Sequence, residues 1–142
     1  MKLFLFLCLF VILSVTACKK SNNNSNVAIP NATVDINLYI NNPSYVNLNS
    51  VGGWVYETGG VRGIIVYKSG TNEFKAYERN CTYQSNNLCA TVSVDVTNIL
   101  VVDSCCHSKF LLLDGSVSNG PATFPLKQYN TTFDGNILHI YN

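Results

Sequence analysis

The fold is decided by two stretches of the sequence, which read CTYQSNNLC at residues 81–89 and DSCCHSKF at residues 103–110. Together they hold four of the six cysteines and one of the two histidines. An apolar, strand-like run separates them, so the cysteines should gather on two loops at the ends of neighbouring strands. Cysteine and histidine are metal ligands, and cysteines form disulfides in oxidising compartments. The two stretches are therefore the candidate functional site.

The rest of the chain predicts β-strands. Polar and apolar residues alternate over residues 33–40 and 73–78, as in a half-buried strand. Further strands are expected around Trp54, over residues 62–67, and in hairpins over residues 91–102 and 130–141, the second of which turns at Asp134-Gly135-Asn136. Apolar residues do not recur at helical spacing over three turns, so we expect an all-β domain.

The residues after the second stretch, together with the two cysteine-containing stretches, form a recognisable order of motifs. They include an Asp114-Gly115 turn, a Gly120-Pro121-Ala122 step, Leu126 and Tyr129. This order resembles the Rieske domain family, which has a first loop Cys-x-His and a second loop Cys-x-x-His followed by Gly-Ser-x-Phe. An Asp-Gly turn, a Gly-Pro-Ala step, a Leu and a Tyr complete the family pattern. The resemblance covers residues 61–141 and implies an antiparallel β sandwich with a small subdomain that bears both ligand loops.

The resemblance also implies positions for the ligands of an iron–sulfur cluster. Cys81 matches the first-loop ligand cysteine, and His107 matches the second-loop ligand histidine. Tyr83 stands in place of the other histidine, and Ser104 stands in place of the second ligand cysteine, with Cys105 one residue away. A Rieske [2Fe–2S] cluster needs two thiolates on one iron and two imidazoles on the other. The cluster ligands are therefore incomplete.

Three interpretations of the cysteines stay open. The first is a pair of disulfides among Cys81, Cys89, Cys105 and Cys106, for which the resemblance implies Cys89 with Cys106 and Cys81 with Cys105. The second is a zinc or single-iron site formed by Cys81, Cys105 and His107. The third is a retained [2Fe–2S] cluster with altered ligands. We expect the disulfides and no cofactor, with zinc or the [2Fe–2S] cluster as alternatives.

The start of the sequence resembles that of a bacterial lipoprotein. Met1 and Lys2 precede an apolar run of about eleven residues, which suits a secretion signal and is too short for a transmembrane helix. Val15-Thr16-Ala17-Cys18 resembles a lipobox, which implies cleavage before Cys18 and acylation of that cysteine. We expect a signal peptide over residues 1–17, the lipidated cysteine and a flexible polar tether over residues 18–30, and the β domain over residues 31–142.

Composition and charge narrow the range of possible functions. Charged residues make up 12% of the chain and the formal net charge is +1, which leaves no basic patch for nucleic acid. No nucleophile with an oriented base is evident, so we do not expect an enzyme. We expect a lipid-anchored protein of the bacterial cell envelope, at the outer membrane, that acts as a cluster-free binding or structural accessory of an envelope complex. The alternative is electron transfer through a Rieske-type cluster with altered ligands.

Overall fold

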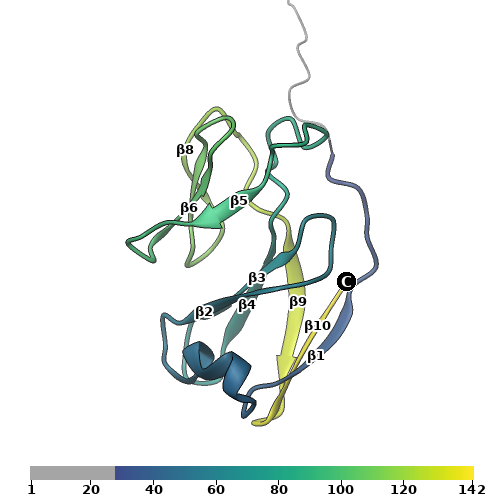
Figure 1. The fold of residues 1–142 in the computed structure, drawn as a ribbon, viewed down its shortest axis with the longest axis vertical. Coiled ribbons are helices and arrows are strands. Elements are labelled where there is room, and N and C mark those ends of the chain that lie inside the picture. Colours follow the sequence, from purple (N-terminus) through teal and green to yellow (C-terminus); the bar gives the residue numbers. More distant parts are fainter. Residues whose placement is uncertain (1–27) are drawn as a thin grey trace, which may run out of the picture.

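A computed structural model describes residues 28–142 as two antiparallel sheets with loops between them (Figure 1). The signal peptide, Cys18 and most of the tether expected from the sequence lie outside these described residues. Within residues 28–142, no helix has the length and apolar character needed to cross a membrane.

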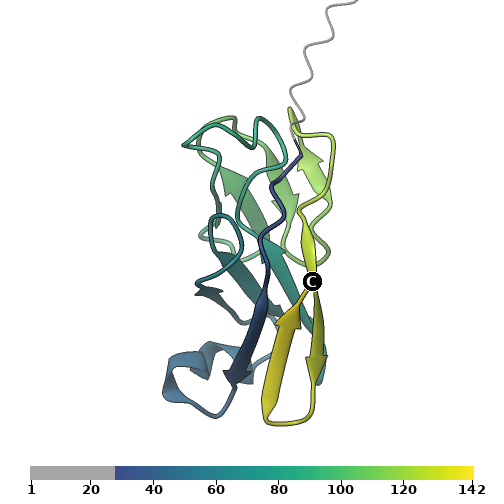
Figure 2. The same cartoon turned by 90° about the vertical axis from the view of Figure 1, so that its right-hand side faces the viewer.

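The larger sheet of the described chain has six strands in the order β1-β10-β9-β4-β3-β2. Their bounds are β1 Asp35–Tyr39, β2 Trp54–Glu57, β3 Ile64–Lys68, β4 Phe74–Glu78, β9 Gln128–Phe133 and β10 Ile137–Tyr141. The first and last strands are neighbours, with Ile36 opposite Ile140 (Figures 1 and 2). The described chain therefore begins and ends in adjacent strands of one sheet.

The smaller sheet is inserted between β4 and β9 and lies at one end of the larger sheet (Figures 1 and 2). Its strands, in the order β5-β6-β7-β8, are β5 Val92–Val94, β6 Leu100–Asp103, β7 Lys109–Leu111 and β8 Val117–Asn119. Two loops project from it: the first loop (residues 79–91) joins β4 to β5, and the second loop (residues 104–108) joins β6 to β7. This is the loop-bearing subdomain expected from the sequence.

Strand β3 is buried on both faces, which explains its continuous apolar sequence. Ile64 and Val66 pack into the core of the larger sheet, whereas Ile65 packs into the core beneath the smaller sheet. Successive side chains of a strand point to opposite faces, so one strand can serve both cores. The second core also contains Cys81, which places the first loop's cysteine in apolar surroundings.

The all-β expectation is confirmed, with three elements that the sequence pattern did not indicate. One is a 3-10 helix, η1 (Pro43–Asn49), which lies at the end of the domain far from the smaller sheet (Figure 2). Asn42 caps η1 by accepting a hydrogen bond from the Ser44 backbone N–H at 3.0 Å. The others are β7 and β8, which have three residues each and are too short for a clear alternation of polar and apolar residues.

Glu78, at the end of β4, is a fully buried carboxylate. Its Oε2 atom accepts hydrogen bonds from the Val61 backbone N–H and the Tyr129 hydroxyl, each at 2.7 Å. Its Oε1 atom accepts from the backbone N–H groups of Arg62 and Asn80, each at 2.9 Å. Four donors thus meet one carboxylate, which satisfies the rule that a buried charge needs hydrogen-bond partners. Asn80 lies in the first loop, directly before Cys81.

Candidate functional site

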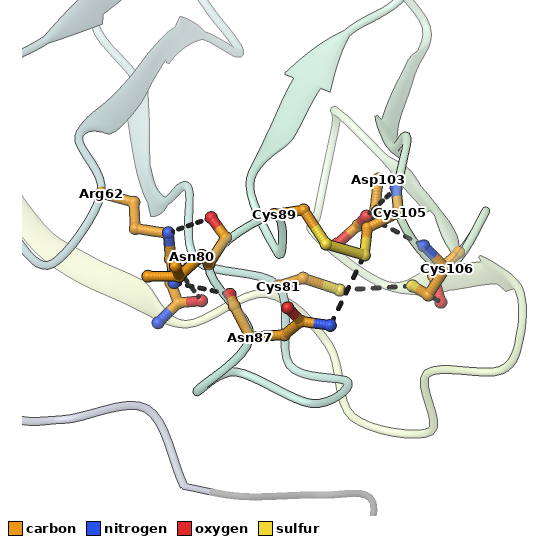
Figure 3. Close-up of a disulfide and its surroundings, with 10 residues drawn as sticks. Arg62, Asn80, Cys81, Asn87, Cys89, Asp103, Cys105 and Cys106 are labelled. Carbon is orange, nitrogen blue, oxygen red and sulfur yellow. Dashed lines mark hydrogen bonds between the residues drawn. A yellow bond between two sulfur atoms is a disulfide. The ribbon is translucent and has the colours of Figure 1, made fainter.

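The first loop is held against the larger sheet by Arg62. Its Nη1 and Nη2 atoms donate to the carbonyl oxygens of Leu88 and Asn87, each at 2.7 Å, and its Nε donates to Asn80 Oδ1 at 3.1 Å (Figure 3). The rigid guanidinium fork suits such a set of acceptors better than a lysine would. The sequence analysis did not predict this role for Arg62. The only clue in the sequence is a charged residue placed just before a buried strand.

The second loop is shaped by Asp103, the last residue of β6. Its Oδ1 atom accepts hydrogen bonds from the backbone N–H groups of Cys105 at 2.6 Å and Cys106 at 3.1 Å. The His107 N–H donates to the Asp103 carbonyl at 2.9 Å, and His107 has a left-handed φ of +62°. The resulting tight turn leaves His107 exposed, while Cys106 is half-buried against the second core.

A disulfide between Cys89 and Cys105 joins the two loops, with an S–S length of 2.05 Å (Figure 3). The expected pairing of Cys89 with Cys106 is therefore wrong, as is that of Cys81 with Cys105. Cys105 and Cys106 present their sulfur atoms differently, because Cys105 lies exposed at the loop surface and Cys106 packs inward. A shift of one residue along the turn changes which sulfur reaches Cys89.

The two remaining cysteines of the described chain meet beside this disulfide. Cys81 Sγ lies 3.9 Å from Cys106 Sγ, and both are free thiols (Figure 3). A carboxylate oxygen of Asp103 lies within 4.8 Å of both sulfur atoms. Cys81 and Asp103 are fully buried, and the Oδ2 atom of Asp103 has no hydrogen-bond partner. Two thiols and one carboxylate therefore form a compact donor cluster, which we call the Cys81–Asp103–Cys106 cluster.

The surroundings of this cluster act on the Cys81 thiol in opposite directions. Burial raises the pKa of Cys81 well above its ordinary value, and the neighbouring Asp103 carboxylate raises it further. The Tyr83 backbone N–H, which donates to Cys81 Sγ at 3.5 Å, lowers that pKa, but by less than burial raises it. Cys81 is therefore a protonated thiol at neutral pH.

Cys106 is held through a third segment of chain. Its Sγ donates a hydrogen bond to Ser108 Oγ at 3.0 Å, and the Ala122 backbone N–H donates to the same oxygen at 2.9 Å. Thr82 Oγ1 likewise donates to the Phe124 carbonyl at 2.7 Å. The segment with the Gly-Pro-Ala step thus packs behind both loops.

The metal set that the sequence offered as an alternative to the disulfides, Cys81 with Cys105 and His107, does not form. The sulfur of Cys105 is in the disulfide, and His107 is not part of the donor cluster. The family's Gly-Ser-x-Phe pattern explains the difference when it is matched at Ser108 and Phe110. His107 then stands at the glycine, in agreement with its positive φ.

In this corrected register the four family ligand positions hold Cys81, Tyr83, Asp103 and Cys106. A Rieske cluster needs two imidazoles, and no histidine of the described residues belongs to the donor cluster. His139 is on β10 in the larger sheet, where its Nε2 atom lies 2.7 Å from Asp35 Oδ1. The four residues at the family ligand positions therefore do not fit a cluster that needs two thiolates and two imidazoles.

We expect His107→Gly to raise the free energy of unfolding by about 0.5–1 kcal/mol, because glycine adopts a left-handed conformation without a Cβ clash. Part of the gain is offset by the greater freedom of glycine in the unfolded chain. Urea unfolding followed by the fluorescence of Trp54, the single tryptophan, measures the change. His107→Ala is the matched control, since it removes the same imidazole and keeps the Cβ. An equal gain from alanine would contradict this origin.

Comparisons with known proteins agree with the fold. No family model matches the sequence, and no curated protein matches it. The cyanobacterial plasma membrane Rieske protein PetC3 from Synechocystis PCC 6803 superposes with a TM-score of 0.56 at 23% identity, over 75% of this chain and 99% of that one.

The ferredoxin of carbazole 1,9a-dioxygenase from Nocardioides aromaticivorans IC177 superposes with a TM-score of 0.44 at 14% identity, over 65% of this chain and 86% of that one. The likeness to the cyanobacterial protein spans nearly its whole length, and the strand order, subdomain and paired loops follow the expected architecture. The chain therefore has a Rieske-like fold.

Proposed function

We propose that this protein is a cell-envelope lipoprotein whose Rieske-like domain carries no iron–sulfur cluster and serves as a binding or structural accessory rather than an enzyme. The observation that carries the proposal is the donor set at the two loops. Cys81, Asp103 and Cys106 supply two thiols and a carboxylate, whereas a Rieske cluster requires two thiolates and two imidazoles. The Cys89–Cys105 disulfide joins the loops covalently without any metal.

The proposed anchor rests on the start of the sequence. A short apolar run followed by Val15-Thr16-Ala17-Cys18 supports cleavage before Cys18 and attachment of the chain to a lipid bilayer through acyl groups. The polar residues that follow Cys18 suit a flexible tether between membrane and domain. We place the anchored domain at the outer membrane of the envelope.

A binding role is supported by apolar side chains that are exposed at the loops. Leu88, in the first loop, is 89% exposed, and Phe124, in the segment that backs both loops, is 58% exposed. Exposed apolar side chains are a common component of protein contact surfaces. The partner that we propose for these loops is another envelope protein with a complementary apolar surface.

Analysis of iron, acid-labile sulfide and visible absorbance tests the cluster-free proposal. The full chain, exported to an oxidising compartment and purified in detergent, is expected to be colourless and to contain no labile sulfide. Two irons and two labile sulfides per chain would instead establish electron transfer through a [2Fe–2S] cluster with altered ligands. The Cys81→Ser variant is the control, because a cluster held at this site would be lost from it.

A further inference from the structure

We propose that the Cys81–Asp103–Cys106 cluster binds a single zinc ion. The proposal rests on the cluster-free part of the proposed function and adds a mononuclear metal to it. The ligand set differs from the alternative that the sequence offered, because Asp103 and Cys106 replace His107 and Cys105. Figure 3 shows the three side chains approaching one another next to the Cys89–Cys105 disulfide.

The separation of the two sulfur atoms matches zinc. Tetrahedral zinc with Zn–S bonds of about 2.3 Å requires two thiolate ligands about 3.8 Å apart. Cys81 Sγ and Cys106 Sγ are 3.9 Å apart in the structure. Both sulfur atoms can therefore bind one ion without movement of the loops. A carboxylate oxygen of Asp103 is within 4.8 Å of both sulfurs, which leaves a small adjustment for the third ligand.

The side chain of Asp103 supports a metal site independently of the distance between the two sulfur atoms. Its side chain is fully buried, its Oδ1 atom is occupied by the N–H groups of Cys105 and Cys106, and its Oδ2 atom has no partner. A buried carboxylate oxygen that has lost its water and has only the weakly donating Cys81 thiol beside it is costly. A cation bound at Oδ2 removes that cost. The same backbone donors hold the carboxylate in place, as hydrogen-bonded neighbours commonly do for metal ligands.

Each thiol has a neighbouring group that can donate a hydrogen bond to the sulfur once a metal has displaced the proton. The Tyr83 N–H already donates to Cys81 Sγ, and the Ser108 hydroxyl lies 3.0 Å from Cys106 Sγ. When Cys106 loses its proton to bind a metal, the Ser108 hydroxyl can rotate and donate to the thiolate. Its Oγ atom keeps the hydrogen bond from the Ala122 N–H. Each thiolate thus has one donor in the surrounding shell.

The donor types select the metal. Thiolates with one carboxylate suit zinc, whereas magnesium and calcium prefer sites built from oxygen atoms. Binding releases the two thiol protons and leaves the three protein ligands with a fourth position for water or for an atom of a partner. Cys106 is half-buried rather than closed off, so the ion can enter from its side of the cluster.

Metal titration of the full chain in detergent tests the inference. After anaerobic reduction with a weak thiol reagent and removal of metal by a chelator, zinc is expected to bind with one ion per chain. Cobalt(II), used as a spectroscopic probe, should give the intense absorption of a tetrahedral thiolate complex. Cys81→Ser and Cys106→Ser should each weaken zinc binding by at least about 100-fold, because loss of even a hydrogen-bond partner of a metal ligand commonly costs about 10- to 100-fold. Asp103→Asn keeps an oxygen that can bind the ion, and should weaken binding by about 10- to 100-fold.

His107→Asn and Ser104→Ala are the matched controls, because both residues are exposed neighbours of the ligands and neither belongs to the donor cluster. Both are expected to bind zinc as the parent does. Circular dichroism shows that each variant is folded. Unchanged binding in Cys106→Ser, or weaker binding in His107→Asn, would overturn the assignment of ligands.

Two further outcomes separate this inference from the proposed function. A metal-free protein in which Cys81 and Cys106 form a second disulfide, or fail to bind zinc as thiols, would overturn the zinc site and leave the cluster-free function standing. Iron with labile sulfide at the same residues would overturn both. One zinc ion per chain in the parent protein, lost in the cysteine variants, supports both.

Discussion

Glu78→Ala is expected to lower the free energy of unfolding by about 3–5 kcal/mol, because it leaves several buried donors without an acceptor. Glu78 accepts hydrogen bonds from three backbone N–H groups and from the Tyr129 hydroxyl. The carboxylate and burial together raise the pKa of Tyr129, with burial the larger cause. Tyr129 therefore stays a protonated donor and cannot relieve the loss by ionising.

Urea unfolding followed by Trp54 fluorescence measures this effect. Trp54 is a suitable probe because its Nε1 atom donates to Asn98 Oδ1 at 2.8 Å and so connects β2 to the β5–β6 turn. Glu78→Gln keeps the volume but replaces an acceptor oxygen with a donor, so we expect a smaller loss of about 2 kcal/mol. Glu73→Ala, at an exposed position near the start of the same strand, should change stability by less than about 0.5 kcal/mol. A loss of stability for Glu78→Ala as small as that expected for Glu73→Ala would contradict the prediction and show that the four donors find other acceptors.

Loss of Glu78 should also disturb the geometry of the candidate site. The carboxylate fixes the backbone of Arg62, whose guanidinium holds the first loop through Asn87 and Leu88. It also fixes Asn80, the residue before Cys81. The donor cluster is therefore positioned by a buried network of the larger sheet and not by its own loops alone.

Replacing both Cys89 and Cys105 by serine is expected to lower the free energy of unfolding by about 3 kcal/mol, because the unfolded chain is then no longer constrained by a loop closed over a sequence separation of 16 residues. The double variant and its parent are compared by the same urea unfolding, in metal-free buffer. The parent with its disulfide reduced should resemble the double variant.

Cys81→Ser with Cys106→Ser is the matched control for this experiment. It also removes two cysteines from the same loops, but it opens no disulfide. Peptide mapping without reduction checks the pairing directly and should recover a peptide that joins Cys89 to Cys105. A parent that is no more stable than the Cys89/Cys105 double variant, or a peptide that joins Cys89 to Cys106, would contradict the structure.

Much of the fold could be predicted because its signals are local. Alternating polar and apolar residues located β1 and β4, and the Asp134-Gly135-Asn136 turn located the hairpin of β9 and β10. The resemblance indicated the loop-bearing subdomain. In contrast, Glu78 looked like one polar residue of an alternating strand, because its four donors come from residues distant in the sequence or from backbone atoms.

The sequence by itself determined that this is a β domain with four cysteines on two loops, since strand periodicity and turn residues depend on near neighbours. Only the tertiary structure decided which sulfur atoms meet. Adjacent residues such as Cys105 and Cys106 point in different directions, and a disulfide needs closely spaced and correctly oriented Cβ atoms. One step of register in the second loop therefore placed Cys105 in the disulfide and brought Cys106 to Cys81 and Asp103.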